Sequence, residues 1–222
     1  MTFESFVPGP CNRQALDAAL FTARHPGGEP LYIFGPSGTG KTHLLRAVED
    51  HIRRTRPELS LICVQSEQFL ALLIQSIRWD CREEFDKTYG SAHVLLLDDL
   101  QFLADKPTTY ETFLALCRKL HASGRQVVVT ADRAPEDEFF SRGQVVGLEL
   151  PRRETRKRII TAMSEHLGLA LEPEVVELLT DSVTDSVRHI EGTLKRLLAW
   201  RDLMDLPPTL ENAARILKDS EQ

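Results

Sequence analysis

The chain has 222 residues, of which 42% are hydrophobic and 27% charged, and its formal net charge is −6. This length suits one large domain or a domain with a small appendage. The acidic balance argues against a general nucleic-acid coating protein but leaves room for a local basic surface. No apolar run approaches the roughly 18 residues of a membrane span, and the N-terminus lacks the pattern of a secretory signal. We therefore expect a cytoplasmic protein. Its four cysteines have no metal-type spacing and are expected to be reduced thiols.

The first part of the sequence predicts a helix, a strand and a second helix. Asn12 is placed to cap the first helix, which a His-Pro-Gly-Gly segment at residues 25–28 ends. The apolar run at residues 31–34 predicts a buried strand, and apolar residues recur at helical spacing from Leu44 to Ile52.

Between that strand and that helix lies a phosphate-binding loop pattern, Gly-Pro-Ser-Gly-Thr-Gly-Lys-Thr. Backbone N–H groups of such a turn surround phosphates, and the helix N-terminus adds a favourable field. Lys41 is expected to reach the β- and γ-phosphates, and the Thr42 hydroxyl to ligate Mg²⁺. A chance match in an ordinary turn is the alternative, but the flanking strand and helix favour a site for ATP or ADP. Its expected contacts are Gly35, Pro36, Ser37, Gly38, Thr39, Gly40, Lys41, Thr42 and His43.

Strands and helices alternate up to about residue 150, which predicts a parallel α/β sheet. Further strands are expected at 61–64, 94–99, 127–130 and 145–150, with helices near 69–77, 85–89 and 108–120. Thr108 and Glu111 are spaced as a capping box, and Gly124 is placed to end that helix. After Pro151 no strand pattern remains, and helices are expected at 155–167, 173–179, 186–203 and 209–217. We therefore predict an α/β core at 1–150 and an all-helical domain at 151–222.

Polar residues follow the strands where the sheet would bind a ligand. Asp98 is expected to hold Mg²⁺ through water, and Asp99 to orient the attacking water, although either could simply cap a turn. Asp132 could sense the γ-phosphate or stabilise a turn. Arg188 lies near the start of a predicted helix, where a cation opposes the helix dipole, so it serves either a ligand or the surface.

Several segments, in order, resemble the AAA+ ATPase part of the bacterial chromosomal replication initiators, the DnaA family. They are Thr2–Val7 with Gly9 and Asn12-Arg13, the phosphate loop (Walker A), residues 66–69, 76–78 and 84–85, Val94–Phe102 (Walker B), Thr130–Arg133 (sensor 1) and Val187–Gly192 (sensor 2). The resemblance implies a P-loop NTPase fold with a five-stranded parallel sheet and a helical lid. It places Val7 and Asn12 on the adenine side, Asp132 at sensor 1 and Arg188 at sensor 2.

The sequence also departs from that family. The family's lead-in to its arginine finger is missing, so Arg142, in a segment similar to the end of that motif, is the finger candidate for a neighbouring subunit. Lys106 matches a position that contacts single-stranded DNA, but Pro107, Thr108 and Thr109 follow instead of a second basic residue. The family's duplex-reading and N-terminal domains are not found, which resembles the Hda-type regulators. The clamp-binding motif of those regulators is not found either.

We expect an ATP-binding, slowly hydrolysing AAA+ switch in the initiation of chromosomal replication or its regulation. Its expected partners are other AAA+ subunits, with weak single-stranded DNA contact through Lys106 and neither sequence-specific duplex binding nor membrane binding. A helicase-loader or transposition-helper ATPase and a non-catalytic ATP- or ADP-binding module remain alternatives. A small-molecule kinase is less favoured, because paired Asp98-Asp99 suits water activation. The basic cluster at residues 152–158 is interpreted as a solvated helical turn rather than a DNA or partner surface.

Overall fold

The computed structural model describes residues 1–218, apart from the Arg82 side chain. Contacts divide the chain into two compact units. The α/β unit comprises residues 1–6, 12–36 and 40–148, and the helical unit comprises residues 7–11, 37–39 and the segment from Glu149 onward. By its contacts the middle of the phosphate loop, Ser37–Thr39, is therefore grouped with the helical unit.

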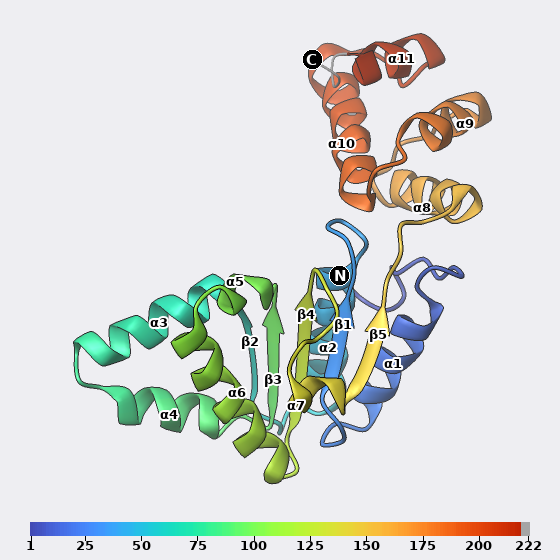
Figure 1. The fold of residues 1–222 in the computed structure, drawn as a ribbon. Helices are drawn as coiled ribbons and strands as arrows, with labels where there is room; N and C mark the ends of the chain where they lie inside the picture. Colours follow the sequence, from blue (N-terminus) through green and yellow to red (C-terminus); the bar gives the residue numbers. More distant parts are fainter. Residues whose placement is uncertain (219–222) are drawn as a thin grey trace. The chain divides into compact units, whose positions relative to one another are not determined.

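The α/β unit is built on a five-stranded, all-parallel sheet with the strand order β2-β3-β4-β1-β5 (Figure 1), which confirms the predicted fold class. The strands are β1 (Leu31–Phe34), β2 (Leu61–Gln65), β3 (Val94–Asp98), β4 (Gln126–Ala131) and β5 (Gln144–Gly147). The fifth strand is shorter than the predicted 145–150. It pairs with the four-residue β1, and after Phe34 that strand leaves the sheet for the phosphate loop, so little remains for β5 to pair with beyond Gly147.

Helices cover both faces of this sheet (Figure 1). They are α1 (Arg13–Arg24), α2 (Lys41–Thr55), α3 (Ser66–Arg78), α4 (Arg82–Gly90), α5 (Gln101–Ala104), α6 (Pro107–Ala122) and α7 (Glu138–Ser141). Alternate strand residues face opposite layers. Leu95 and Leu97 pack into a cluster with α3, α4 and α6, whereas Leu96 packs with α1 and α2. Burial on both faces explains why the strands read as continuous apolar runs.

Three predictions about helix ends had different outcomes. Gly124 follows α6 with φ +68°, and its N–H donates to the His121 carbonyl, as expected of a helix-ending glycine. Asn12 stands at the N-cap of α1, but its side chain makes no capping hydrogen bond. The capping box is wrong, because α6 already begins at Pro107, a residue suited to a first helical turn. The four-residue helices α5 and α7 were not predicted.

The helical unit contains α8 (Arg153–His166), α9 (Pro173–Ser182), α10 (Val187–Met204) and α11 (Leu210–Lys218), close to the predicted ranges. Ile160, Leu179 and Leu194 are at the centre of its apolar core. None of the described helices is long and apolar enough to cross a membrane.

The basic cluster at residues 152–158 mostly holds the helical unit together. Arg153 Nη2 lies 2.6 Å from Glu177 Oε2, and Lys157 pairs with the same carboxylate. Arg156 donates to the Thr180 carbonyl at 3.0 Å. These contacts join α8 to α9, so Arg153, Arg156 and Lys157 are engaged within the helical unit and are not simply solvated.

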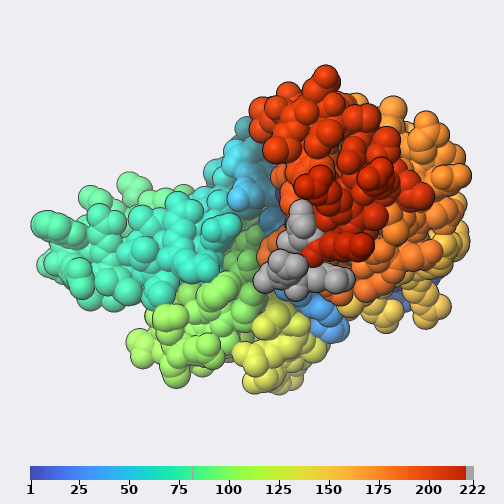
Figure 2. Space-filling model, turned by 90° about the horizontal axis from the view of Figure 1, so that it is seen from above, coloured from blue at the N-terminus to red at the C-terminus, as the bar shows by residue number. Residues whose placement is uncertain are grey.

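The α3–α4 segment forms a projection at one side of the α/β unit, visible in teal in Figure 2. Buried aromatic rings fix it to the sheet layer, since Phe69 packs edge to face on Tyr89 and Phe113 with centroids 5.2 and 5.4 Å away. Its outer surface is apolar in part, because Ile77 and Trp79 are largely exposed.

Candidate functional site

The phosphate loop has the backbone geometry that its glycines allow. Gly38 and Gly40 have φ of +73° and +106°, in the left-handed region where a side chain is disfavoured. A Cβ at Gly38 would also lie 2.6 Å from the Ser186 Cβ. Glycine is therefore required at Gly38 for space as well as for conformation. After Gly40 the chain enters α2, a helix of 15 residues whose N-terminus supplies unpaired N–H groups.

Lys41 places a buried ammonium group inside this loop. Its side chain is only 6% exposed, and Nζ donates to the carbonyls of Gly35 at 2.8 Å and Pro36 at 3.0 Å. Those two carbonyls hold the ammonium group inside the loop. A lysine held there beside a helix N-terminus is an arrangement that suits a phosphate group, and the loop geometry therefore fits a nucleoside phosphate.

The carboxyl ends of β1, β3 and β4 meet at one edge of the sheet, because these strands are parallel neighbours. The phosphate loop follows β1, and Asp98 ends β3, where it is 2% exposed. The Thr130 hydroxyl near the end of β4 donates a hydrogen bond to Asp98 Oδ1. The predicted loop and acid are thus brought to the same edge, as sequence reasoning expected.

Thr130 is a site residue that sequence reasoning missed. Besides holding Asp98, its hydroxyl accepts the Asp99 N–H at 2.9 Å, and its carbonyl accepts the Leu100 N–H at 2.8 Å. A β-branched threonine inside an apolar strand reads as an ordinary strand residue, which hid this role. Its position in the strand next to the acidic one was the available signal.

Asp99 has an unusual backbone and a restrained side chain. Its φ of +60° lies in the left-handed region, which aspartate tolerates better than most residues. Its Oδ1 accepts a hydrogen bond from Gln101 Nε2 at 3.0 Å. The turn after β3 therefore presents two carboxylates held by different partners, Asp98 by Thr130 and Asp99 by Gln101.

These carboxylates suit Mg²⁺, which commonly keeps several waters and takes one or two carboxylates together with substrate phosphates. Within the described part of the chain, no group of three or more His, Cys, Asp or Glu side chains could hold a metal. A complete protein cage is therefore lacking there, and Asp98 and the Thr42 hydroxyl offer oxygen donors of the kind that a phosphate-bound Mg²⁺ takes.

Asp132 follows β4 at the rim of a cavity of about 270 Å³. It is exposed, and its nearest cation is Arg133, at 3.8 Å. Tyr110 on the cavity wall donates to Asp137 Oδ2 at 2.6 Å, and burial, with that acceptor, raises the pKa of its phenol. Burial likewise raises the pKa of Tyr32, so both phenols stay protonated donors at neutral pH.

Arg188 is the second residue of α10. Within the helical unit its Nη1 lies 3.4 Å from the Ser37 hydroxyl, and the neighbouring Val187 N–H donates to the Gly38 carbonyl at 2.9 Å. Ser186 caps the helix by accepting the His189 N–H. The predicted sensor arginine is thus next to the residues of the phosphate loop that belong to the same unit.

Arg142 lies at the amino ends of the strands, opposite the carboxyl edge that bears the loop, just before β5 begins at Gln144. Four strand residues at about 3.3 Å each place it some 13 Å from the edge that bears the loop. It is exposed, and its guanidinium pairs with Glu138. Lys106 is exposed too, and its Nζ donates to the Phe102 carbonyl at 2.9 Å. Neither side chain joins the site within its own chain.

The residues predicted for the adenine side occupy different surroundings. Val7 packs against the apolar core of the helical unit, and Asn12 is buried at the start of α1. His43 Nε2 lies 2.9 Å from the Thr2 carbonyl, and its ring packs edge to face on Phe6. The His43 side chain, predicted as a phosphate contact, thus holds the N-terminal segment against α2.

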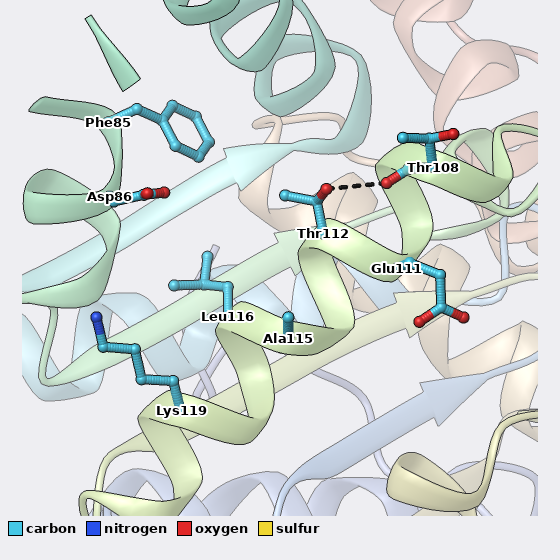
Figure 3. A pocket seen from close by; sticks show the side chains of 8 residues that line it. All are labelled: Phe85, Asp86, Thr108, Glu111, Thr112, Ala115, Leu116 and Lys119. Atoms are coloured by element: carbon cyan, nitrogen blue, oxygen red, sulfur yellow. Dashed lines mark hydrogen bonds between the residues drawn. The ribbon is translucent and has the colours of Figure 1, made fainter. Parts of the chain in front are cut away.

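A second cavity, of about 500 Å³, lies between α4 and α6 (Figure 3). Phe85 and Asp86 come from α4, and Leu116 and Lys119 are on α6. Thr108 and Glu111 line it as helix residues, which agrees with their failure to form a capping box. Its mixed lining does not favour one ligand class.

Comparison with known proteins connects this chain with the bacterial DnaA initiators. The profile described as the bacterial DnaA ATPase domain matches residues 1–141. The chromosomal replication initiator protein DnaA of a Synechocystis strain is 38% identical over 97% of this chain and 51% of the relative, and that of Herpetosiphon aurantiacus is 37% identical over 98% and 48%. The chain spans about half the length of the curated relatives it matches.

Solved structures agree with this. The crystal structure of domain III from the Thermotoga maritima replication initiation protein DnaA has a TM-score of 0.94 and 37% identity, covering 98% of this chain and 95% of that one. A replication initiator DnaA bound to AMPPCP and single-stranded DNA has a TM-score of 0.84 and 29% identity, covering 99% and 68%. Family profile, relatives and fold coincide, and the chain belongs to the bacterial DnaA ATPase-domain family.

Proposed function

We propose that this chain binds ATP with Mg²⁺, hydrolyses it slowly, and acts as an AAA+ switch in the initiation of chromosomal replication or its regulation, in the bacterial cytoplasm. The observation that carries the proposal is the buried Lys41 ammonium group, held by two loop carbonyls beside the N-terminus of α2. The AMPPCP bound to two related DnaA structures supports a nucleotide as the ligand.

The proposed roles are those that the resemblance to the DnaA family implies for these residues. Gly35 to His43 hold the phosphates, with Lys41 as the cation, and Thr42 and Asp98 hold Mg²⁺. When bound, Mg²⁺ would neutralise charge on the β- and γ-phosphates. Asp99 orients the attacking water, Asp132 and Arg188 respond to the γ-phosphate, and Val7 and Asn12 lie on the adenine side. We propose residues 1–150 as the core and 151–222 as the lid.

Assembly with other AAA+ subunits completes the proposed site. Arg142 lies at the edge of the sheet opposite its own phosphate loop, so it is better placed to serve a neighbouring copy than its own. Its pairing with the exposed Glu138 is a surface ion pair, which costs little to exchange for a phosphate. We propose Arg142 as the finger for an adjacent subunit.

The proposal includes contact with single-stranded DNA through Lys106. The DnaA structure with single-stranded DNA and the exposure of Lys106 support it. A lone lysine makes a phosphate contact without reading sequence. Binding through Lys106 is expected to be weak, independent of sequence and reduced by salt.

The first experiment measures nucleotide binding in Lys41→Ala. Loss of the loop ammonium is expected to abolish ATP binding at concentrations that saturate the wild type. Lys119→Ala, which removes a lysine from the α4–α6 cavity, is the matched control and should bind normally. Normal ATP binding by Lys41→Ala would contradict the nucleotide site.

The second experiment measures turnover per molecule as protein concentration rises, for the wild type, Arg142→Ala and the exposed control Arg118→Ala. Turnover that climbs for the wild type and the control but stays flat for Arg142→Ala supports an assembling switch. Binding without turnover under any condition would favour a non-catalytic module. Capture of a replicative helicase rather than an initiator would favour a loader.

A further inference from the structure

Asp99 is held by two hydrogen bonds and has a left-handed backbone. Its N–H is bound by the Thr130 hydroxyl, its backbone has φ +60°, and its Oδ1 accepts a hydrogen bond from Gln101 Nε2 at 3.0 Å. A backbone in the left-handed region costs energy and persists where surrounding contacts enforce it. Such contacts leave the carboxylate with one restrained oxygen, Oδ1, and a second oxygen, Oδ2, open to another donor.

Gln101 has little else to hold it in this orientation. The Oε1 atom of Gln101 is buried. Among the buried side-chain nitrogen and oxygen atoms of the described residues, it is the one that has no hydrogen-bond partner. An unsatisfied buried carbonyl lowers stability, so another contact of the Gln101 side chain must favour this orientation of its amide. Turning the amide over would point Oε1 at the Asp99 carboxylate, acceptor against acceptor. The contact with Asp99 therefore determines how this amide lies.

The short helix α5 fixes the position of Gln101. Gln101 is the first residue of α5, and Leu103 in the same short helix is fully buried, which anchors it. Its Nε2 is engaged by Asp99, and its side chain lines the cavity that also contains Asp132. Gln101 can thus set the direction of the Asp99 carboxylate from a position that the buried Leu103 anchors.

We propose that Gln101 is a positioning residue that aims the Asp99 carboxylate at the attacking water. This inference rests on the proposed ATP hydrolysis. An N–H donated to a carboxylate is stronger than a neutral hydrogen bond. With Oδ1 fixed by Gln101, Oδ2 accepts a hydrogen bond from an O–H of the attacking water and so orients the water oxygen toward the γ-phosphate. Loss of the donor lets the carboxylate rotate, and a misplacement of about 1 Å costs on the order of 100-fold in rate.

The test compares Gln101→Leu with Gln75→Leu, a matched change at an exposed position of α3. Gln101→Leu is expected to lower turnover about 10- to 100-fold, while the dissociation constant for Mg·ATP stays within about twofold of the wild type. Gln75→Leu should leave both unchanged. Asp99→Asn should remove most turnover, and adding Gln101→Leu to it should cost nothing more, because the two residues act as one unit.

A second readout does not depend on turnover. In ¹⁵N-labelled protein, the Gln101 side-chain amide signals should shift and lose their protection from exchange in Asp99→Ala, whereas those of Gln75 should not move. Unchanged Gln101 signals, or full turnover in Gln101→Leu with normal binding, would overturn the inference and leave ATP hydrolysis standing. A wild type that neither binds nor hydrolyses ATP would overturn the proposed function and the inference with it.

Discussion

The Thr130 hydroxyl and the Asp98 carboxylate are joined across two neighbouring strands by a buried hydrogen bond. Thr130 is fully buried and Asp98 is 2% exposed, so water does not compete for this contact. The same hydroxyl accepts the Asp99 N–H. One side chain of β4 thereby aligns the end of β3.

Thr130→Val keeps the shape of this side chain and removes both bonds. We expect the free energy of unfolding to fall by about 1–3 kcal/mol, because Asp98 and the Asp99 N–H lose a partner in a buried place. Urea unfolding measures this change. Thr161→Val, which removes an exposed hydroxyl bonded to the Lys157 carbonyl, should stay within about 0.5 kcal/mol. Equal stability of Thr130→Val and the wild type would contradict the alignment role.

The sequence predicted the parts of the carboxyl edge of the sheet where only a few residue types meet the structural requirement. The glycines of the loop, Lys41 and the acid ending an apolar strand predicted a phosphate site beside Asp98, and the structure places them at one sheet edge. Continuous apolar runs predicted β1, β3 and β4, whose residues are buried almost throughout because both faces of the sheet are covered there.

Contacts between segments that are far apart in the sequence could not be predicted from it. Thr130 and Gln101 look like a strand residue and a surface glutamine, and their roles depend on Asp98 and Asp99 as neighbours. The capping box failed because Pro107 starts the helix one residue before Thr108. The place of Arg142 opposite the loop emerges only from strand order and direction.

A matched pair of glycine substitutions tests the loop geometry. Gly35 has φ +153°, and a Cβ there would lie 2.3 Å from the Leu148 carbonyl oxygen, a backbone atom that cannot easily move. Gly35→Ala is expected to lower the free energy of unfolding by about 1–3 kcal/mol. Gly192, inside α10, has nothing within 4 Å of that position. Gly192→Ala should therefore raise stability by about 0.5–1 kcal/mol. Thermal or urea unfolding measures both changes in stability. Equal effects of the two substitutions would contradict the conclusion that Gly35, unlike Gly192, must be a glycine.

Glu49 on α2 predicts part of the acid sensitivity. Burial favours a higher pKa for its carboxyl, but hydrogen bonds from Arg46 at 2.7 Å and Arg53 at 3.0 Å outweigh burial and lower the pKa below its ordinary 4.5. A lowered folded pKa means that the unfolded chain binds the proton more readily. The stabilisation is therefore present above about pH 4.5 and is lost as pH falls through the lower folded value.

Glu49→Gln removes this titration. The loss of unfolding free energy between pH 7 and pH 3.5 should be smaller in Glu49→Gln than in the wild type, measured by urea unfolding at each pH. Glu58→Gln, at an exposed position, should keep the wild-type dependence. An identical pH dependence in Glu49→Gln and the wild type would show that these ion pairs are already broken in solution.

The four free cysteines should differ in reactivity because the thiolate is the reactive form. Burial, with the charge of Glu49, raises the pKa of the Cys63 thiol to about 12, so only about one molecule in 10⁴ is ionised there at pH 8. Burial also raises the pKa of Cys117, which is inaccessible, and that of Cys11. Cys81, half-buried at the start of α4, is the remaining site.

Native protein treated with a thiol-specific disulfide reagent at pH 8 should therefore show one fast thiol, and Cys81→Ser should remove that phase. Cys117→Ser is the matched control and should leave the fast phase intact, since Cys117 reacts at the rate of unfolding. Nucleotide should not protect Cys81, because that residue is on the α3–α4 projection and the phosphate loop follows β1. Rapid labelling of Cys63 in the native state would mean that the Arg46 side chain, 3.3 Å from its sulfur, stabilises the thiolate more than burial opposes it.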